Sequence, residues 1–220
     1  HFVQLAAKLI QADPSEAEIG RNRGVSVGIH ADLGAVVEQI TAACKASSAV
    51  KEDISGWIDT LKSDAAVWDS ELRSHSDGQE PMHPMDVYTG LEDQLDQDSV
   101  VVMVQWGRSF LKARMPGHHQ RLGPLSHLGG AIPYAMAAKL AYPNSKVLAF
   151  SGDGAFGFYS MEYDTCIRHN INITTVLGND HTWGIDNTFQ KAYYDRAVAT
   201  DLRHIRYDKV VEAIGAYSEH

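Results

Sequence analysis

Apolar and polar positions in the second half of the chain follow two different periods. Three short, mostly apolar runs, at residues 99–104, 146–150 and 173–177, are typical of buried strands. Segments 125–141 and 160–169, between these runs, have apolar residues at helical spacing. Strands separated by helices predict βαβ crossovers. We therefore expect an α/β fold with a doubly wound, mostly parallel sheet and helices on both of its faces.

The beginning of the chain shows a similar alternation on a smaller scale. Residues 1–12 have apolar positions at helix-like spacing, and residues 25–29 alternate like a short strand. Residues 32–45 again have a helical period. We interpret residues 1–45 as the C-terminal part of an α/β middle domain.

Residues 46–80 are interpreted as a linker between two domains. Apolar spacing at residues 54–72 predicts a helix, and the polar stretch around Gly78 indicates a loop. The regular strand–helix alternation follows in residues 81–220, beginning with a helix predicted at 87–95. The sequence thus predicts a second domain at 81–220, which we expect to be incomplete at its C-terminal end.

Composition and charge exclude two classes of partner. The chain has 220 residues and a formal net charge of -9, so no basic stripe is available to replace the counterions of a nucleic acid. Its apolar runs are all shorter than the about 20 residues that a membrane span requires. We expect neither a nucleic acid nor a membrane as partner, although one phosphorylated cofactor needs only a local site.

The cysteines and the start of the chain give two further expectations. Cys44 and Cys166 have no CxxC spacing and are interpreted as small buried thiols. The chain begins at His1 without an initiator Met or a signal-peptide pattern, which predicts a piece of a longer protein. A cytoplasmic location is expected, with an organelle as the open alternative.

The segment that carries chemistry directly follows the strand predicted at 146–150. Its sequence, SGDGAF, places Asp153 between Gly152 and Gly154. Ligands of open parallel sheets bind beyond the carboxyl ends of the strands. Glycines let the backbone turn sharply and approach a ligand, and amides exposed in such a turn can hold a phosphate.

A second turn follows the strand predicted at 173–177 and has the sequence GNDHTWG. One helix and one strand separate Asp180 in this turn from Asp153, so both turns should emerge at the same edge of the sheet. Two oxygen-bearing side chains would then meet at one point. Oxygen ligands suit Mg²⁺ or Ca²⁺, and Mg²⁺ usually bridges to phosphates.

GDGAF, followed by a strand that ends in GND, resembles the GDG…NN signature of thiamine diphosphate (ThDP)-dependent enzymes. The resemblance implies that Asp153, Asp180 and the backbone carbonyl of Thr182 hold Mg²⁺, which anchors the cofactor diphosphate. By the same resemblance, the residues next to the cofactor also include Gly152, Gly154, Ala155, Trp183 and Gly184. The chain departs from the signature at Asp180, where Asn is usual. The extra negative charge is expected to weaken cofactor affinity or to raise its metal dependence, and Asn179 is the alternative side-chain ligand.

A third match lies upstream of the GDG strand. The segment His127-Leu128-Gly129-Gly130 resembles the glycine-rich turn and apolar wedge of the family. The resemblance implies that Leu128 holds the cofactor in a bent conformation. His127 precedes this position, and an orientation toward the substrate is a minor alternative for it.

Other conspicuous residues have simpler interpretations. The pair His118-His119 is expected in a solvated loop, because adjacent side chains point apart on regular elements. Phe156 and Phe158 are expected in the core. For Trp183, packing near the cofactor and core packing alone are equally good interpretations.

Within the family, flanking text favours acetolactate synthase-like enzymes of branched-chain amino acid biosynthesis. Residues 15–40 resemble the end of their middle domain, and residues 206–217 resemble the segment that follows their metal turn. The alternatives are oxalyl-CoA decarboxylase or 2-hydroxyacyl-CoA lyase, suggested by residues 152–170, and the benzaldehyde lyase group. The resemblance implies ThDP- and Mg²⁺-dependent making or breaking of C–C bonds on a 2-oxo acid such as pyruvate. The sequence leaves the use of FAD open.

The family resemblance also implies a partner. The Glu that activates the cofactor belongs to a separate pyrimidine-binding domain, which this chain is not expected to contain. That domain would come from another subunit, so a homodimer or homotetramer is expected, and the chain alone should be inactive. A non-catalytic fragment, or a cofactor-binding subunit of a split enzyme, is the alternative of another class.

Overall fold

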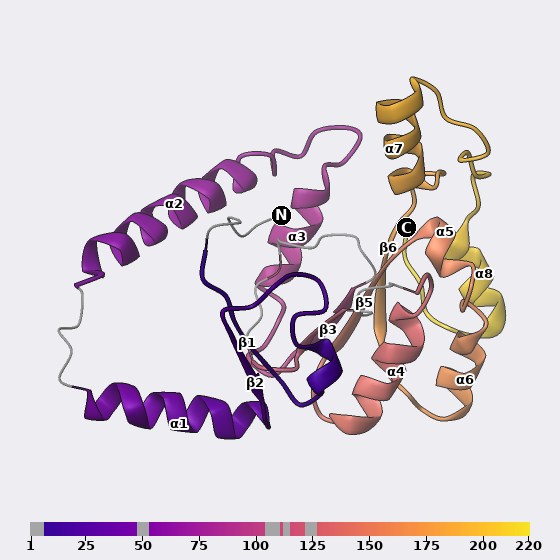
Figure 1. Ribbon diagram of the computed structural model, residues 1–220. Coiled ribbons are helices and arrows are strands. Elements are labelled where there is room, and N and C mark those ends of the chain that lie inside the picture. The colour runs from indigo at the N-terminus through magenta and orange to yellow at the C-terminus, as the bar shows by residue number, and fades with distance from the viewer. Residues whose placement is uncertain (1–6, 48–52, 104–110, 112–114, 122–126) are drawn as a thin grey trace. The chain divides into compact units, whose positions relative to one another are not determined.

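The computed structural model describes residues 7–47, 53–103, 111, 115–121 and 127–220. The chain separates into two compact units, His1–Lys62 and Ser63–His220. Figure 1 shows the elements of both units. The domain boundaries expected near residues 45 and 81 stay predictions.

The described residues of the first unit form a two-stranded parallel sheet, a 3-10 helix, an α-helix and the beginning of helix α2 (Ser55–Arg73). Its complete elements are β1 (Ile10–Asp13), the 3-10 helix η1 (Glu16–Glu18), β2 (Val27–His30) and α1 (Leu33–Ala46). The strand expected at 25–29 and the helix expected at 32–45 are therefore confirmed, and the side chain of Asp32 caps the helix by accepting from the Ala35 amide at 3.0 Å.

The helix predicted for residues 1–12 is wrong where the structure describes its end. Residues Ile10–Asp13 form β1 and pair in register with Val27–His30. Hydrogen bonding to a strand distant in sequence overrides the helical spacing of the apolar side chains, because a short apolar run has no decisive period of its own. The remaining part of the prediction, residues 1–6, lies outside the described residues.

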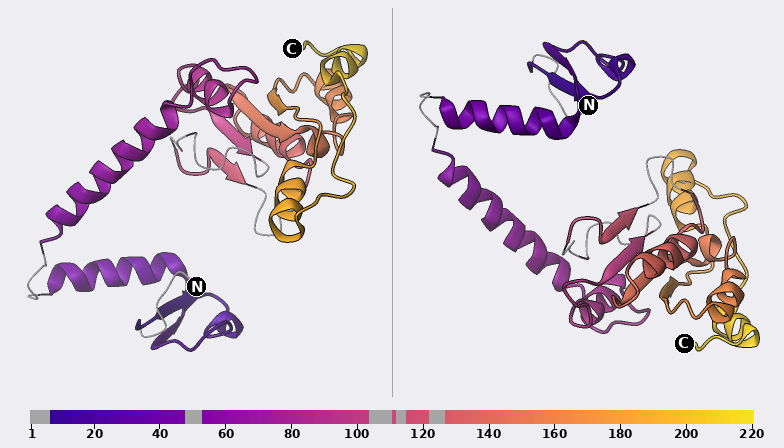
Figure 2. Two further views of the ribbon diagram at one scale, coloured as in Figure 1. Left: turned by 90° about the horizontal axis from the view of Figure 1, so that it is seen from above. Right: turned by 90° about the horizontal axis from the view of Figure 1, so that it is seen from below.

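Helix α2 (Ser55–Arg73) is continuous and spans the boundary between the units (Figure 2). The following elements belong to the second unit: α3 (Pro84–Glu92), β3 (Val100–Met103), β4 (His119–Arg121), α4 (Ala131–Ala141), β5 (Val147–Gly152), α5 (Asp153–Phe156), α6 (Glu162–Arg168), β6 (Thr174–Gly178), α7 (Gly184–Tyr194) and α8 (Tyr207–Ile214). The strands expected at 99–104, 146–150 and 173–177 thus correspond to β3, β5 and β6.

The larger sheet has four parallel strands in the order β4-β3-β5-β6. The chain runs from β3 outward to β4, and from β5 outward to β6 on the other side. Connections that leave neighbouring strands in opposite directions create a switch point, here between β3 and β5, where open α/β sheets bind ligands. Helix α5 begins at the carboxyl end of β5, directly after Gly152.

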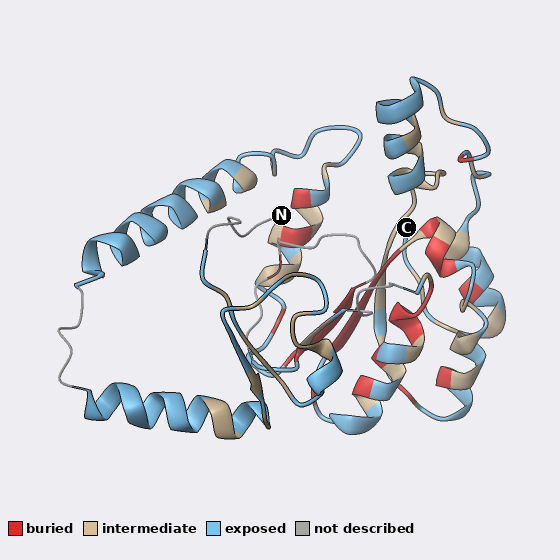
Figure 3. Ribbon diagram, in the orientation of Figure 1, coloured by how far each residue is buried: buried red, intermediate tan, exposed pale blue. Residues whose placement is uncertain are grey.

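Helices cover both faces of the larger sheet, so the doubly wound fold is confirmed (Figure 1). On one face, Val100, Val102, Val147 and Ala149 pack against alanines of α4. On the other face, the alternate residues of β3 and β5 pack against Met85 and Tyr88 of α3. Figure 3 shows β3 and β5 as the most deeply buried strands. Side chains buried on both faces account for the continuous apolar runs in the sequence.

Some local expectations are wrong. His119 begins strand β4, and His118 is buried with its Nδ1 atom 3.0 Å from the carbonyl of Asp98, so this pair is not a solvated loop. Parallel pairing with β3 draws the pair into the sheet. Cys44 is exposed on α1, whereas Cys166 is buried as expected. Helices α7 and α8 were not predicted, although the apolar residues of α8, at positions 207, 210, 211 and 214, follow a helical period.

Candidate functional site

The two turns of interest emerge at the same edge of the larger sheet. Gly152 at the end of β5 pairs in register with Gly178 at the end of β6. Asp153 follows the first glycine and begins α5, and Asn179 and Asp180 follow the second. The side chains brought together by the topology are those that the sequence predicted to meet.

Asp153 is a buried carboxylate with one oxygen available. Its side chain is 2% exposed, and its Oδ1 accepts a hydrogen bond from the Gly154 amide at 2.9 Å. No donor of the described residues reaches its buried Oδ2. Burial raises the pKa of the Asp153 carboxyl above its ordinary value, and the charge of Asp180 adds to the rise, while the amides of Gly154 and His181 offset part of it. A buried anion of this kind calls for a cation.

Asp180 is exposed and lies in an otherwise half-buried turn with a specific backbone shape. Its Oδ1 accepts from the Thr182 amide at 3.1 Å, and His181 between them has a φ of 59°. Gly184 lets the carboxylate lie close to the backbone, because a Cβ at this position would be 3.0 Å from Asp180 Oδ2. Thr182 forms an isolated antiparallel bridge with Asp201. This bridge uses the amide of Trp183 and the carbonyl of His181, so it leaves the carbonyl of Thr182 outside its hydrogen bonds.

The donor set fits a hard divalent cation. Two carboxylates, one of them buried with an unsatisfied oxygen, and a backbone carbonyl are all oxygen ligands, which Mg²⁺ prefers. The described residues contain no cluster of three His, Cys, Asp or Glu side chains able to hold a metal, so a protein-only cage is not built here. Mg²⁺ typically keeps other ligands, such as phosphate oxygens, when few carboxylates hold it.

Asn179, the alternative ligand, is partly engaged elsewhere. Its Nδ2 atom donates to the carbonyl of Ile205 at 3.0 Å. This bond orients the side-chain amide toward residues beyond α7. The Asn179 Oδ1 atom, however, is buried with no hydrogen-bond partner among the described residues, so Asn179 stays an alternative to Asp180, whose charge raises the Asp153 pKa.

Gly154 and Trp183 join the two turns sterically. A Cβ at Gly154 would lie 2.7 Å from the Trp183 ring, so this position requires a glycine while the ring is in place. The same ring meets Phe158 edge-on, with centroids 6.3 Å apart. Trp183 therefore packs over the GDG turn. Phe156 is buried as expected, but Phe158 is 55% exposed, so its assignment to the core is wrong: it projects from the turn after α5 instead of joining the sheet.

The glycine-rich turn at 129–130 also lies against the GDG segment. Gly129 has a φ of 80°, and a Cβ there would lie 2.6 Å from the Cβ of Phe158 and 2.9 Å from the carbonyl of Ala155. Leu128, next to it, is partly buried against the α4 face of the sheet. Its expected role as a wedge stays a prediction. The three sequence motifs nevertheless converge on one region.

His127 and Glu162 are placed by their neighbours. The Nε2 atom of His127 lies 2.9 Å from the Tyr159 hydroxyl, and the imidazole is exposed. Glu162 is the first residue of α6, a helix that begins after the turn containing Phe158. An orientation of His127 toward a substrate stays a prediction.

Sequence reasoning missed a segment that contacts the Asp180 turn. Residues 199–206, which we call the strap, hydrogen-bond to residues 179–183 from beyond α7. Thr200, with 3% of its surface exposed, is the most buried residue of the strap. No apolar period or known spacing marks this irregular segment, so only the three-dimensional contacts identify it.

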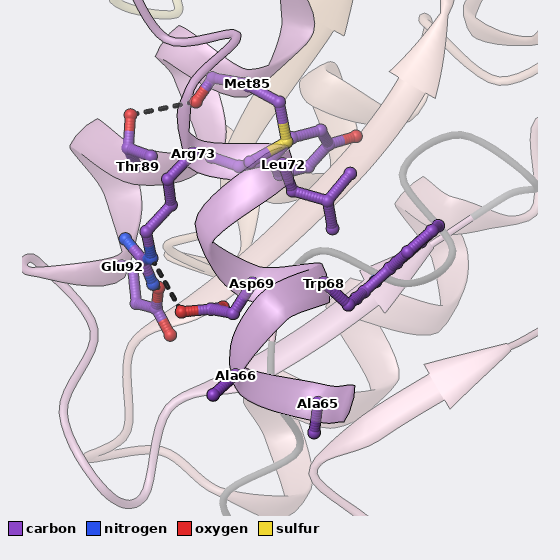
Figure 4. A pocket seen from close by; sticks show the side chains of 10 residues that line it. Ala65, Ala66, Trp68, Asp69, Leu72, Arg73, Met85, Thr89 and Glu92 are labelled. Carbon is purple, nitrogen blue, oxygen red and sulfur yellow. Dashed lines mark hydrogen bonds and ion pairs between the residues drawn. The ribbon is translucent and has the colours of Figure 1, made fainter. Parts of the chain in front are cut away.

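A hollow of about 380 Å³ lies elsewhere in the second unit, between α2 and α3 (Figure 4). The residues that line it are Ala65, Ala66, Trp68, Asp69, Leu72, Arg73, Met85, Tyr88, Thr89 and Glu92. Arg73 bridges two carboxylates there, Asp69 at 3.0 Å and Glu92 at 2.6 Å. None of the residues predicted for the site lines this hollow.

No helix of the described residues has the length and apolar character needed to cross a membrane. This finding agrees with the short apolar runs of the sequence.

Comparison with known proteins gives the chain a family. Residues 100–219 match the family described as thiamine pyrophosphate enzyme, C-terminal TPP binding domain, and TPP is a synonym of ThDP. The chain is 35% identical to the acetolactate synthase large subunit IlvG of Mycobacterium tuberculosis over 96% of its length, and 27% identical to the sulfoacetaldehyde acetyltransferase of Alcaligenes xylosoxydans xylosoxydans, also over 96%. It spans 39% of the length of the first relative and 40% of the second. The matched residues include β3, the GDG turn and the Asp180 turn, and the chain therefore belongs to the ThDP-dependent enzymes, with residues 100–219 as the C-terminal ThDP-binding domain.

Proposed function

We propose that the chain binds ThDP through Mg²⁺ and contributes the diphosphate half of an acetolactate synthase-like active site. The observation that carries the proposal is the buried Asp153 carboxylate, whose Oδ2 has no donor among the described residues and which faces the charge of Asp180. This arrangement is unfavourable without a cation and favourable with one. The acetolactate synthase-like assignment is supported by 35% identity to the M. tuberculosis IlvG subunit.

Asp153, Asp180 and the carbonyl of Thr182 would hold the Mg²⁺. The amide that faces Asp153 from Gly154 already orients one oxygen, which leaves the other for the metal. Trp183 covers the turn from the side of Gly154 and would exclude water from the diphosphate. These residues would bind the metal and orient the cofactor diphosphate, and we assign no proton transfer to them.

ThDP, when bound, supplies the nucleophilic carbon and the electron sink for chemistry next to a carbonyl. The reaction proposed for the whole protein is decarboxylation of pyruvate and transfer of the remaining fragment to a second 2-oxo acid. The substrate would be a 2-oxo acid. The activating Glu would belong to a pyrimidine-binding domain supplied by another subunit. A homodimer or homotetramer is the proposed assembly, because each ThDP then lies between two domains.

Titration calorimetry with ThDP and Mg²⁺ tests the metal site. Asp153→Ala should abolish Mg²⁺-dependent ThDP binding, since loss of a hard-cation ligand also leaves the diphosphate charge unscreened. Asp180→Asn should preserve or strengthen binding, because an amide oxygen still coordinates while one negative charge beside the diphosphate is removed. Asp59→Asn, an exposed change on α2, is the matched control. Binding that survives Asp153→Ala, or is destroyed by Asp180→Asn, would contradict these roles.

A further inference from the structure

The turn that carries Asp180 has a backbone conformation that needs support. His181 has a φ of 59°, in the left-handed region, where a residue with a Cβ is less stable by about 1–2 kcal/mol. The next amide, that of Thr182, donates to Asp180 Oδ1 at 3.1 Å. The left-handed residue thus lies between a candidate metal ligand and the amide that this ligand accepts from. Something outside the turn must stabilise this shape.

The strap supplies two backbone hydrogen bonds to this turn. The amide of Trp183 donates to the carbonyl of Thr200 at 2.8 Å, and the amide of Leu202 donates to the carbonyl of His181 at 2.7 Å. Together they hold the residues on both sides of Thr182 in an antiparallel bridge with Asp201. The strap therefore holds the carbonyl of the left-handed residue, His181, and the amide of Trp183 two residues later.

Side chains reinforce the same contact. Thr182 Oγ1 donates to the Thr200 carbonyl at 2.9 Å, and Asn179 Nδ2 donates to the Ile205 carbonyl at 3.0 Å. The imidazoles of His181 and His204 approach to 2.8 Å between nitrogens. These contacts reach the turn at its beginning, its middle and its end.

Thr200 is the centre of the strap. Its carbonyl accepts two hydrogen bonds from the turn, and its hydroxyl accepts a third from Asn187 Nδ2 of α7 at 2.8 Å. The residue is 3% exposed and is preceded by Ala199, whose φ of 58° is also left-handed. A buried threonine that is hydrogen-bonded to both the turn and α7 couples the position of one to that of the other.

We propose that the strap, residues 199–206, sets the position of the metal-binding turn, and that Thr200 is a positioning residue for the Mg²⁺ site. The identity of the ligand, Mg²⁺, rests on the proposed function. The hydrogen bonds between the strap and the turn do not depend on it. Thr200 touches neither metal nor cofactor in this scheme. It acts through the backbone of residues 180–183, by keeping Asp180 and the Thr182 carbonyl near Asp153.

Two isosteric variants remove strap contacts without changing side-chain volume. Thr200→Val leaves Asn187 Nδ2 without its acceptor, and Thr182→Val removes the donor to the Thr200 carbonyl. Thr200→Ser keeps the hydroxyl that accepts from Asn187 and should behave like the wild type. Thr60→Val is the matched control, because the Thr60 hydroxyl bonds only within α2, to the Gly56 carbonyl at 2.9 Å.

Hydrogen exchange of the ligand-free, full 220-residue chain is the first measurement. In both Val variants we expect amides of residues 179–184 to exchange about tenfold faster, while β5 keeps its protection. Calorimetry with Mg²⁺ at saturating ThDP is the second measurement, and we expect the Mg²⁺ dissociation constant to rise about tenfold, with rescue by Thr200→Ser.

Unchanged exchange in both Val variants would contradict the claim that the strap stabilises residues 179–184. Faster exchange with an unchanged Mg²⁺ dissociation constant would contradict the claim that the strap positions the Mg²⁺ site. If the amides of β5 also exchange faster in Thr200→Val, this variant has destabilised the whole domain. The comparison of Thr182→Val with the wild type then tests the role of the strap. A wild-type chain with normal exchange that binds no more Mg²⁺-ThDP than Asp153→Ala would instead contradict the proposed function.

Discussion

At the scale of the residue, the buried Asp153 carboxylate is expected to destabilise the folded chain when no ligand is bound. A carboxylate that is 2% exposed, with an oxygen that no described donor reaches, is unfavourable in a ligand-free domain. The nearby charge of Asp180 makes it more so. Such an arrangement is expected where a cation restores the balance, and it makes the stability of the ligand-free chain depend on pH.

The direction of that dependence follows from the pKa. Burial raises the pKa of Asp153 in the folded chain above its ordinary value of 3.8. Its contribution to stability is therefore greatest below 3.8 and is lost as the pH rises from 3.8 through the raised value, because over this range the folded chain holds a proton that the unfolded chain has already lost. Asp153→Asn should remove this loss and stabilise the ligand-free chain at neutral pH.

Thermal unfolding in the presence of a chelator measures the effect. We expect Asp153→Asn to raise the midpoint by a few degrees at neutral pH, since about 1 kcal/mol corresponds to about 2–4 °C in a chain of this size. The difference should shrink on acidification, and the exposed control Asp59→Asn should show no such trend. A variant less stable than the wild type at neutral pH would mean that the Asp153 carboxylate is already compensated.

At the scale of elements, the turn before α4 is locked against the segment after α5. Gly129 combines a φ of 80° with distances of 2.6 Å and 2.9 Å from a would-be Cβ to Phe158 and to the backbone of Ala155. Gly129→Ala therefore has both a strained backbone and a collision with main-chain atoms. We expect it to lower the free energy of unfolding by at least about 1–2 kcal/mol.

Chemical denaturation checks this, with Gly90→Ala as the matched control. Gly90 lies inside α3 with open space around its would-be Cβ. The same substitution there should raise stability by about 0.5–1 kcal/mol, because alanine has the higher helix propensity. If both variants shift stability in the same direction, close packing at Gly129 is not the decisive factor.

Buried strands were predictable from the sequence, and short elements that depend on pairing with distant strands were not. Strands β3 and β5 are buried on both faces, so their runs of apolar residues left little ambiguity. The register pair of Gly152 and Gly178 then brought the two acidic turns together, as parallel topology requires. In contrast, β1 and β4 are short and owe their conformation to pairing with distant strands.

The candidate site divides in the same way. Glycines and acids at strand ends have a direct physical meaning, so the sequence could single out Asp153 and Asp180 as candidate ligands, which they stay in the structure. Thr200 could not, because its importance comes from backbone groups, which every residue type carries. The exposure of Phe158 was also missed, since an aromatic residue after a buried strand gives no sign of which way the chain turns.

At the scale of the whole molecule, we expect the 220-residue chain to be inactive by itself. A group that activates the cofactor must lie within about 2.6–3.2 Å of the pyrimidine ring. The carboxylates at this sheet edge, Asp153 and Asp180, are assigned to the diphosphate end. The purified chain should therefore release no carbon dioxide from pyruvate with Mg²⁺ and ThDP present.

Adding the pyrimidine-binding region of the family, in the same chain or as a separate polypeptide, should give activity. The Asp153→Ala chain with the same addition is the control, and it should stay inactive. Carbon dioxide release by the chain alone, dependent on both Mg²⁺ and ThDP, would contradict the expectation and require an activating acid within these residues.

The strand order of the larger sheet has a consequence for the way the protein is made. β3 lies inside the sheet, but its neighbours β4 and β5 both follow it in the sequence. During synthesis, the apolar segment Val100–Met103 leaves the ribosome with neither flank paired, and its contact with β5 must wait until Val147–Gly152 has emerged. Closing so long a loop is slow compared with hairpin formation. The nascent chain thus carries an apolar strand with at least one unpaired edge until Val147–Gly152 has emerged, which is the kind of segment that chaperones protect.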